Sequence, residues 1–371
     1  MVFSSSLFLF GFLPVVLAIY FFSHNRYRNL VLLIASLFFY AWGEPRNVLV
    51  MLASILINYL LGLGIEKASK QKKLFLILSV LYNIGVLFYF KYLNFAGSIW
   101  ESLTGQTLNM KTIVLPIGIS FFTFQIMSYV IDVYRGNVPA QKNLINLALY
   151  ISLFPQLIAG PIVRYIDVEA QIKQRESTWD GAYVGVKRFA IGFAKKVLIA
   201  DQLATLADTV FAGGNYPSML SHWIGIIAYT LQIYYDFSGY SDMAIGLGKI
   251  FGFDFLENFN YPYISRSIKE FWRRWHISLS SWFRDYLYIP LGGNRKGKVR
   301  TYINLIIVFF VTGLWHGASF NFIVWGLYYA VFLVIERLGF GKRLEKLPRI
   351  IQHVYTLLVV VIGWVFFGQT H

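Results

Sequence analysis

The stretch Thr301–Ile335, TYINLIIVFFVTGLWHGASFNFIVWGLYYAVFLVI, contains no Asp, Glu, Lys or Arg in 35 residues. A single helix of that length would be about 52 Å long, whereas the hydrocarbon core of a bilayer is about 30 Å thick. The stretch is also too short for two ordinary spans of roughly 20 residues each. It therefore predicts a membrane segment that is either one long tilted helix or a helix broken inside the membrane.

The candidate break is Gly313–Asn321, GLWHGASFN, where glycine allows backbone or ligand to approach closely. Tyrosines aside, His316 is the only ionisable residue of the stretch and lies near its middle. Ionisable groups inside a membrane are costly and usually face the protein interior or a water-filled cavity. An imidazole can take a proton from an attacking hydroxyl. His316 is therefore either a general base or a histidine satisfied by hydrogen bonds between helices.

The composition of the whole chain extends this membrane interpretation. Of its 371 residues, 57% are hydrophobic and only 14% are charged, against about a quarter charged in soluble domains. The net charge of +15 resides mostly in short loops between apolar runs, as the positive-inside rule expects, and does not indicate a nucleic-acid partner. The absence of cysteine excludes disulfides, a cysteine nucleophile and thiolate metal sites, and we expect no metal site.

About ten apolar segments are long enough to enter a bilayer, some of them as re-entrant segments. They are Ser6–Phe22, Leu30–Trp42, Val48–Ile65, Leu74–Phe90, Ile113–Val130, Leu144–Val163, Tyr183–Ala200, His222–Ile250, Ile303–Ile335 and Ile350–Phe367. The basic loops His24–Arg28 and Glu66–Lys73 lie two segments apart, which places the N-terminus outside and these loops in the cytoplasm. The pattern predicts an all-α polytopic membrane protein.

Simple alternation of the loops fails around Leu144–Val163, because basic stretches flank this one segment on both sides. Phe154-Pro155 and Gly160-Pro161 would break a helix there. The segment is therefore either re-entrant or an exception to the positive-inside rule. The following stretch, Gln171–Lys196, mixes aromatic and basic residues and is typical of an interfacial helix.

A second informative segment, Phe271–Gly297, is both aromatic and basic. If it is helical, one face carries Arg273, His276 and Ser280, and another carries Trp272, Trp275 and Leu279. An interfacial helix, with tryptophans at headgroup depth, explains the Trp and Arg residues. It does not explain His276 or the glycine-rich turn that contains Asn294.

A third segment carries Gln232, Asp236 and Tyr240 at intervals of four, which on a helix form one polar stripe. In an apolar span such a stripe either lines an interior cavity or holds helices together. Gly246, Gly248 and Gly252 follow, but no strand precedes them. Tight helix packing therefore explains them better than a dinucleotide site.

These segments resemble the membrane-bound O-acyltransferase family, and within it the branch of the bacterial alginate O-acetyltransferase membrane subunit and its peptidoglycan-modifying relatives. The matching motifs are YYDFSGYSDMAIGLGK (Tyr234–Lys249), FWRRWHISLSSWFRDYLYIPLGGNRKG (Phe271–Gly297) and TGLWHGASFNFIVWG (Thr312–Gly326). The resemblance covers nearly the whole chain, residues 1–371, as a single domain. Members of this branch usually continue with further helices, so the resemblance implies a chain without the family's last C-terminal helices.

The resemblance implies helices around a central tunnel in a bacterial inner membrane. A cytoplasmic thioester donor, acetyl-CoA or an acyl carrier protein, would approach one mouth of that tunnel and a hydroxyl acceptor the other. It implies no permanently bound cofactor. The partners that it implies are a periplasmic esterase-like acetyltransferase and an exported polysaccharide such as alginate.

The family's histidine maps onto His316, and its second polar position maps onto His276. His276 would orient the acceptor or stabilise charge at the thioester carbonyl. We expect six further residues to contact substrate or line the tunnel: Trp315, Asp236, Tyr240, Gln232, Asn294 and Arg273. The alternative is a proton-coupled transporter in which His316 and Asp236 form a relay.

Overall fold

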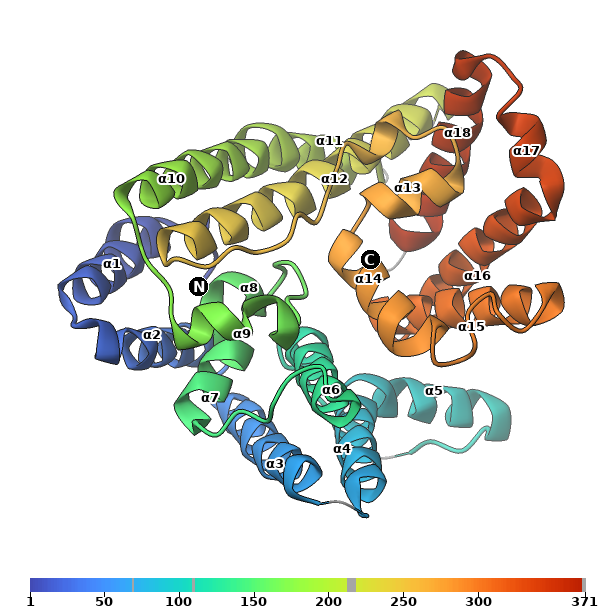
Figure 1. Ribbon diagram of the computed structural model, residues 1–371. Coiled ribbons are helices and arrows are strands. Elements are labelled where there is room, and N and C mark those ends of the chain that lie inside the picture. The colour runs from blue at the N-terminus through green and yellow to red at the C-terminus, as the bar shows by residue number, and fades with distance from the viewer. Residues whose placement is uncertain (69, 109–110, 212–217, 369–371) are drawn as a thin grey trace. The chain divides into compact units, whose positions relative to one another are not determined.

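The computed structural model describes residues 1–68, 70–108, 111–211 and 218–368, and every regular element in these ranges is a helix (Figure 1). The prediction of an all-α protein is therefore confirmed for this part of the chain. The helices form two compact units. The first unit is Met1–Ile191 with Tyr240–Leu256, and the second is Gly192–Gly239 with Glu257–His371.

The first unit is built mainly from the N-terminal half of the chain. Its elements are η1 (Leu7–Phe12), α1 (Leu13–Phe22), η2 (Asn25–Tyr27), α2 (Arg28–Gly43), α3 (Val48–Lys67), α4 (Lys72–Leu87), η3 (Phe88–Tyr92), α5 (Leu93–Thr104), α6 (Ile119–Arg135), α7 (Leu144–Ser152), α8 (Phe154–Leu157), α9 (Tyr165–Lys173), most of α10 (Trp179–Ala194) and the end of α12 (Met219–Ile250). Helices α3, α4 and α6 pack on one another.

The second unit contains the start of α12 and the C-terminal part of the chain. Its other elements are η4 (Lys195–Ala200), α11 (Asp201–Phe211), η5 (Pro262–Ile264), α13 (Ile268–Arg274), α14 (Ile277–Phe283), η6 (Arg284–Tyr288), α15 (Lys298–His316), α16 (Phe320–Ile335), η7 (Glu336–Phe340), α17 (Gly341–Leu344) and α18 (Arg349–Gly368). An aromatic core joins α13, α16 and α18, and includes Phe271, Trp325 and Trp364.

Helices α15 and α16 form a tight hairpin in the second unit (Figure 1). An ideal Cβ on Gly313 would lie 2.3 Å from the carbonyl oxygen of Phe322, and one on Gly326 would lie 2.2 Å from that of Phe309. Only glycine permits so close an approach of the two backbones. The predicted break at Gly313–Asn321 is confirmed, since α15 ends at His316.

The expectation that Thr301–Ile335 is too short for two spans is wrong. Helix α15 begins at Lys298, before the uncharged run, and the helix that starts at Phe320 continues to Leu344, beyond it. Each helix is long and apolar enough to cross a membrane. His316 therefore lies at one end of a candidate span rather than at the centre of a single segment.

By length and composition, the described residues contain five such helices, which supports a multi-pass membrane protein. They are Val48–Lys67, Lys72–Thr104, Lys298–His316, Phe320–Leu344 and Arg349–Gly368. The other predicted segments remain predictions as membrane spans. Helix α6 begins only at Ile119 rather than at Ile113, because Gly118 precedes it with a φ of 74°.

The segment 144–163 is broken at the predicted place. Helix α7 ends at Ser152, α8 has only four residues, and no helix follows until Tyr165. Of the residues outside these helices, 153 and 160–163 are buried, so that protein surrounds most of the non-helical backbone, as a membrane interior would require.

Close helix packing explains the glycines of α12, as predicted. An ideal Cβ on Gly246 would lie 2.6 Å from the carbonyl oxygen of Gly185 in α10. The backbones of α10 and α12 therefore approach to a distance that only small residues allow.

Substituting Gly326 by Ala should destabilise the hairpin, because the new methyl group has no space against the backbone of α15. Overpacking of this kind typically costs about 1–3 kcal/mol. Thermal unfolding of the detergent-purified protein measures the effect. Gly85→Ala is the matched control, since nothing lies within 4 Å of an ideal Cβ at this helical position. Equal unfolding temperatures for the two variants would contradict the assigned contact.

Candidate active site

His316 is the last residue of α15 and is half-buried. Its imidazole ring lies 4.9 Å from the ring of Trp315, 4.9 Å from that of Trp325 and 5.1 Å from that of Phe367, measured between centroids. The turn begins directly after it, because Gly317 is extended and Ser319 caps α16 through its side chain. The hairpin thus presents one partly accessible imidazole at its tip.

His276 lies between α13 and α14 in a left-handed backbone conformation, with φ 44° and ψ 56°. The segment is therefore not one continuous helix, and Arg273, His276 and Ser280 do not share a helical face. Two backbone hydrogen bonds cause the break, since the amide of Ile277 donates to the carbonyl of Asn258 and that of Asn260 donates to Arg274. His276 is only 1% exposed.

Asn258 determines which nitrogen of His276 carries the proton. The side-chain oxygen of Asn258 accepts from the backbone N–H of Ser278 at 3.2 Å and also lies 3.1 Å from Nδ1 of His276. A backbone N–H can only donate, so this atom is the oxygen and His276 Nδ1 must donate to it. The lone pair of the neutral ring is therefore on Nε2.

Nε2 of His276 is buried and has no hydrogen-bond partner among the described residues. Burial lowers the pKa of His276, which lies outside the candidate membrane spans, to about 3. The ring is therefore neutral near pH 7, and Nε2 can only accept a hydrogen bond. Buried polar atoms in proteins nearly always have a hydrogen-bond partner, so this unpaired acceptor marks His276 as a candidate functional residue.

Trp315 connects the two histidines. Its ring centroid lies 5.9 Å from that of His276 and 4.9 Å from that of His316. Phe237 of α12 packs against the other side of the site, 4.7 Å from the His276 ring. The structure thus brings together three of the predicted site residues, His276 from one motif and Trp315 and His316 from another.

The tryptophans near His276 belong to the core and not to a membrane interface. Trp272 is 8% exposed and Trp275 is 3% exposed, and both pack in the aromatic core of the second unit. The interfacial interpretation of this segment is therefore wrong for these residues. Trp272 lies in the short helix α13, and Trp275 is the C-cap residue of that helix. The Glu336 carboxylate anchors the N-terminus of α13, because it accepts the N–H groups of Ile268 and Lys269.

The predicted polar stripe on α12 divides in the structure. Asp236 forms an ion pair with Lys196, with Nζ and Oδ1 2.7 Å apart. Gln232 is half-buried in the same unit. Tyr240 belongs to the first unit, where its ring stacks on Phe3 at 4.7 Å.

Two more predicted residues lie apart from the histidines. Arg273 is exposed and lines a pocket to which His276 does not contribute. Asn294 is exposed in the glycine-rich turn after η6. Asn258 and Glu336, which position His276 and its helix, were not predicted. Asn258 lies in a loop without a repeating pattern, and its partner is 18 residues away.

Comparison with known proteins identifies the family. The model of the membrane-bound O-acyltransferase family matches residues 57–367. The probable alginate O-acetylase AlgI of Pseudomonas aeruginosa is 52% identical, over 99% of this chain and 72% of its own length. The peptidoglycan O-acetyltransferase of Helicobacter pylori is 37% identical over 99% and 77%, and the teichoic acid D-alanyltransferase of Bacillus subtilis is 29% identical over 74% and 73%. A match over most of the chain, with the paired histidines around Trp315, makes this protein a member of the membrane-bound O-acyltransferase family.

Proposed function

We propose that this membrane O-acyltransferase moves an acetyl group from a cytoplasmic thioester to a hydroxyl of an exported polysaccharide in a bacterial inner membrane. Acetyl-CoA and an acyl carrier protein are the candidate donors. Alginate is the first acceptor to test, because the relative at 52% identity is named a probable alginate O-acetylase. A periplasmic esterase-like partner receives the acetyl group where transfer proceeds in two steps. The single observation that carries the proposal is that the rings of His276 and His316 both pack against Trp315.

The proposed architecture is one catalytic domain of about ten membrane segments around a tunnel that reaches His316. The charges at the open end of the α15–α16 hairpin support an orientation in which this end faces the cytoplasm. Arg295, Lys296 and Lys298 lie at or before the start of α15, and Arg337 and Lys342 follow α16. By the positive-inside rule both ends are cytoplasmic. His316, at the tip, then lies toward the opposite side, where an exported hydroxyl would arrive.

In the proposed reaction, the imidazole of His316 takes the proton of the acceptor hydroxyl as its oxygen attacks the thioester carbonyl carbon. A tetrahedral intermediate forms, the C–S bond breaks, and the leaving thiolate takes the proton back from the imidazolium. The C-terminal end of a helix carries partial negative charge. His316 at the end of α15 is therefore well placed to carry a transient positive charge.

His276 has a different role in this proposal, which is to orient the acceptor. Its Nε2 can accept a hydrogen bond from the hydroxyl, whereas stabilising an oxyanion would need a donor. The bond from Nδ1 to Asn258 supports the first of the two roles expected from the sequence. Gln232, Asp236, Tyr240, Asn294 and Arg273 remain weaker proposals for contacts with substrate or the tunnel.

Removing the imidazole of His316 tests the catalytic assignment. His316→Ala should lower acetyl transfer by roughly 10²–10⁴-fold, the usual contribution of a general base. The assay follows labelled acetyl-CoA with purified protein, alginate oligosaccharides and the candidate periplasmic partner. His222→Ala is the matched control, because His222 is an exposed histidine of the same unit. Wild-type turnover by a folded His316→Ala protein would remove His316 from the mechanism.

The pH profile tests the role of Asn258. In the wild-type protein His276 should cause no inflection between pH 5 and 8, because its pKa of about 3 keeps the ring neutral throughout. In Asn258→Asp, a carboxylate beside Nδ1 favours the imidazolium and raises that pKa. Protonation then occupies Nε2, so activity should fall as the pH is lowered.

Asn258→Ala separates this effect from loss of packing. It removes the tautomer constraint without adding charge, and should lower kcat/KM without the acid limb of Asn258→Asp. Identical pH profiles for Asn258→Asp and wild type, in proteins that elute normally in size-exclusion chromatography, would contradict the assigned tautomer.

A further inference from the structure

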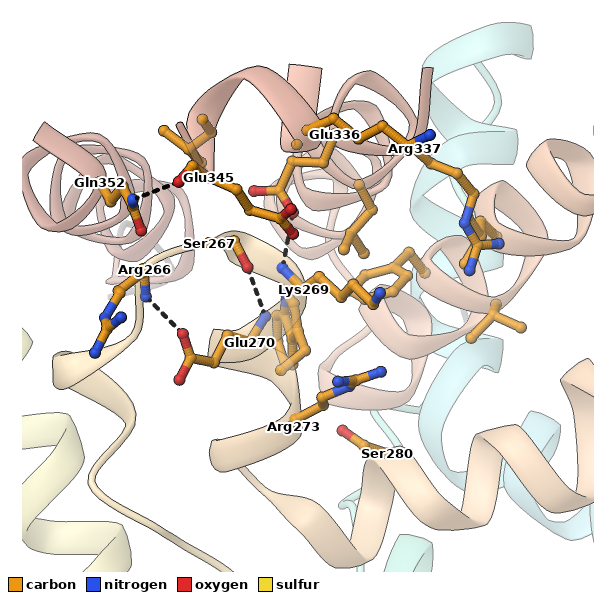
Figure 2. A pocket seen from close by; sticks show the side chains of 18 of the residues that line it. Arg266, Ser267, Lys269, Glu270, Arg273, Ser280, Glu336, Arg337, Glu345 and Gln352 are labelled. Carbon is orange, nitrogen blue, oxygen red and sulfur yellow. Dashed lines mark hydrogen bonds between the residues drawn. The ribbon is translucent and has the colours of Figure 1, made fainter. Parts of the chain in front are cut away.

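A cavity lies in the C-terminal unit, and neither candidate histidine lines it. It has a volume of about 760 Å³ and is lined by residues of α13, α14, α15, α16, η7 and α17 (Figure 2). Ligand pockets in proteins typically measure roughly 300–1,000 Å³, so this cavity is large enough for a ligand of its own.

The cavity combines a cationic part with an apolar part. Five cationic side chains line it against three carboxylates: Arg266, Lys269, Arg273, Arg337 and Lys342 against Glu270, Glu336 and Glu345. Apolar side chains on α14, α15 and α16 complete the wall, and include Leu279, Phe283, Leu305, Val308, Phe309 and Leu333. Such a wall matches a molecule with one anionic end and one apolar end.

Two of the three carboxylates already have partners. Glu336 accepts the backbone N–H groups of Ile268 and Lys269 at 2.7 and 3.0 Å. Glu270 accepts from the backbone N–H of Arg266 and pairs with Arg274. Backbone hydrogen bonds do not neutralise Glu336, but five cations against three carboxylates still leave the lining with a formal net charge of +2.

Three of the cations converge. Figure 2 shows the side chains of Lys269, Arg273 and Arg337 extending toward the same region from α13 and η7. Within the described part of the chain, none of the three forms an ion pair. Arg337 makes one hydrogen bond, to the hydroxyl of Tyr288 at 3.3 Å. Two guanidinium groups and an ammonium group that share one region are suited to phosphate oxygens.

We propose that this cavity binds a phosphate ester that carries a long chain, with the phosphate at Lys269, Arg273 and Arg337 and the chain along the apolar face of α15. An anionic glycerophospholipid is the source that the apolar wall favours. Basic pockets between membrane helices on the cytoplasmic side bind such head groups. The phosphates of coenzyme A are the other source of the same chemistry. Binding of the lipid does not depend on the proposed function.

The test uses the full chain in nanodiscs that contain equal amounts of phosphatidylcholine and phosphatidylglycerol. Native mass spectrometry measures the lipid retained when the protein is released from the nanodisc. The wild type should retain phosphatidylglycerol preferentially. In the triple variant Lys269→Ala/Arg273→Ala/Arg337→Ala that preference should fall by roughly 100-fold, as expected when three cations near a phosphate are removed.

The matched control is Lys67→Ala/Lys72→Ala/Lys73→Ala, which removes three exposed positive charges in the first unit. It should retain phosphatidylglycerol as the wild type does. Leu305→Trp, which fills the apolar part without changing charge, should also reduce retention. Equal thermal midpoints for wild type and variants show that the fold is intact.

Coenzyme A distinguishes the two sources. If the triple variant loses phosphatidylglycerol, the first-unit control retains it and coenzyme A does not displace it from the wild type, the cavity is a lipid site. If the triple variant instead loses binding of coenzyme A, measured by calorimetry, the same phosphate site serves the donor. If the triple variant binds both compounds as the wild type and the control do, the proposal is overturned.

Discussion

The backbone contact between α15 and α16 is the constraint on which the candidate active site depends. In a membrane, lipid tails are as apolar as the side chains between helices, so association relies on close packing rather than on exclusion of water. Gly313 and Gly326 allow each helix to meet a carbonyl oxygen of the other. This contact places the end of α15 beside the start of α16 and fixes the ring of His316 among Trp315, Trp325 and Phe367.

Short elements of the second unit hold the second histidine, His276, in position. Helix α13 has only seven residues, too few to be stable alone. The Glu336 carboxylate at its N-terminus and the aromatic core along its side hold it in place. His276 directly follows Trp275, the C-cap residue of α13. The Glu336 carboxylate on η7 and the side chain of Asn258 therefore fix the position of the buried His276 ring. The second histidine therefore depends on contacts from three parts of the chain.

The sequence predicted those features that follow from the cost of charge in lipid. The prediction of His316 as a site residue rests on the absence of any other ionisable residue except tyrosine in Thr301–Ile335, and the break beside it was predicted from its glycines. The broken segment after Leu144 followed from its prolines. These signals are local, since a residue and its neighbours are sufficient to generate them.

The errors concern features that distant residues determine. A helical pattern through Arg273 and Ser280 was reasonable, but two hydrogen bonds to the loop around Asn258 interrupt it. The tryptophans suggested an interface because composition cannot distinguish a headgroup layer from an aromatic core. Asp236 could not be assigned to an ion pair, because Lys196 lies 40 positions away in the chain.

The left-handed backbone at residue 276 has a consequence for how this protein can change. A side chain other than glycine costs roughly 1–2 kcal/mol in that conformation, so glycine is the residue that the peptide geometry itself prefers there. Glycine would, however, lose the buried contacts of the His276 ring with Phe237 and Trp315, and removing a large buried side chain typically costs roughly 2–5 kcal/mol, more than the backbone would gain. A variant library screened for thermal tolerance should therefore retain a large side chain at position 276 in spite of the backbone strain.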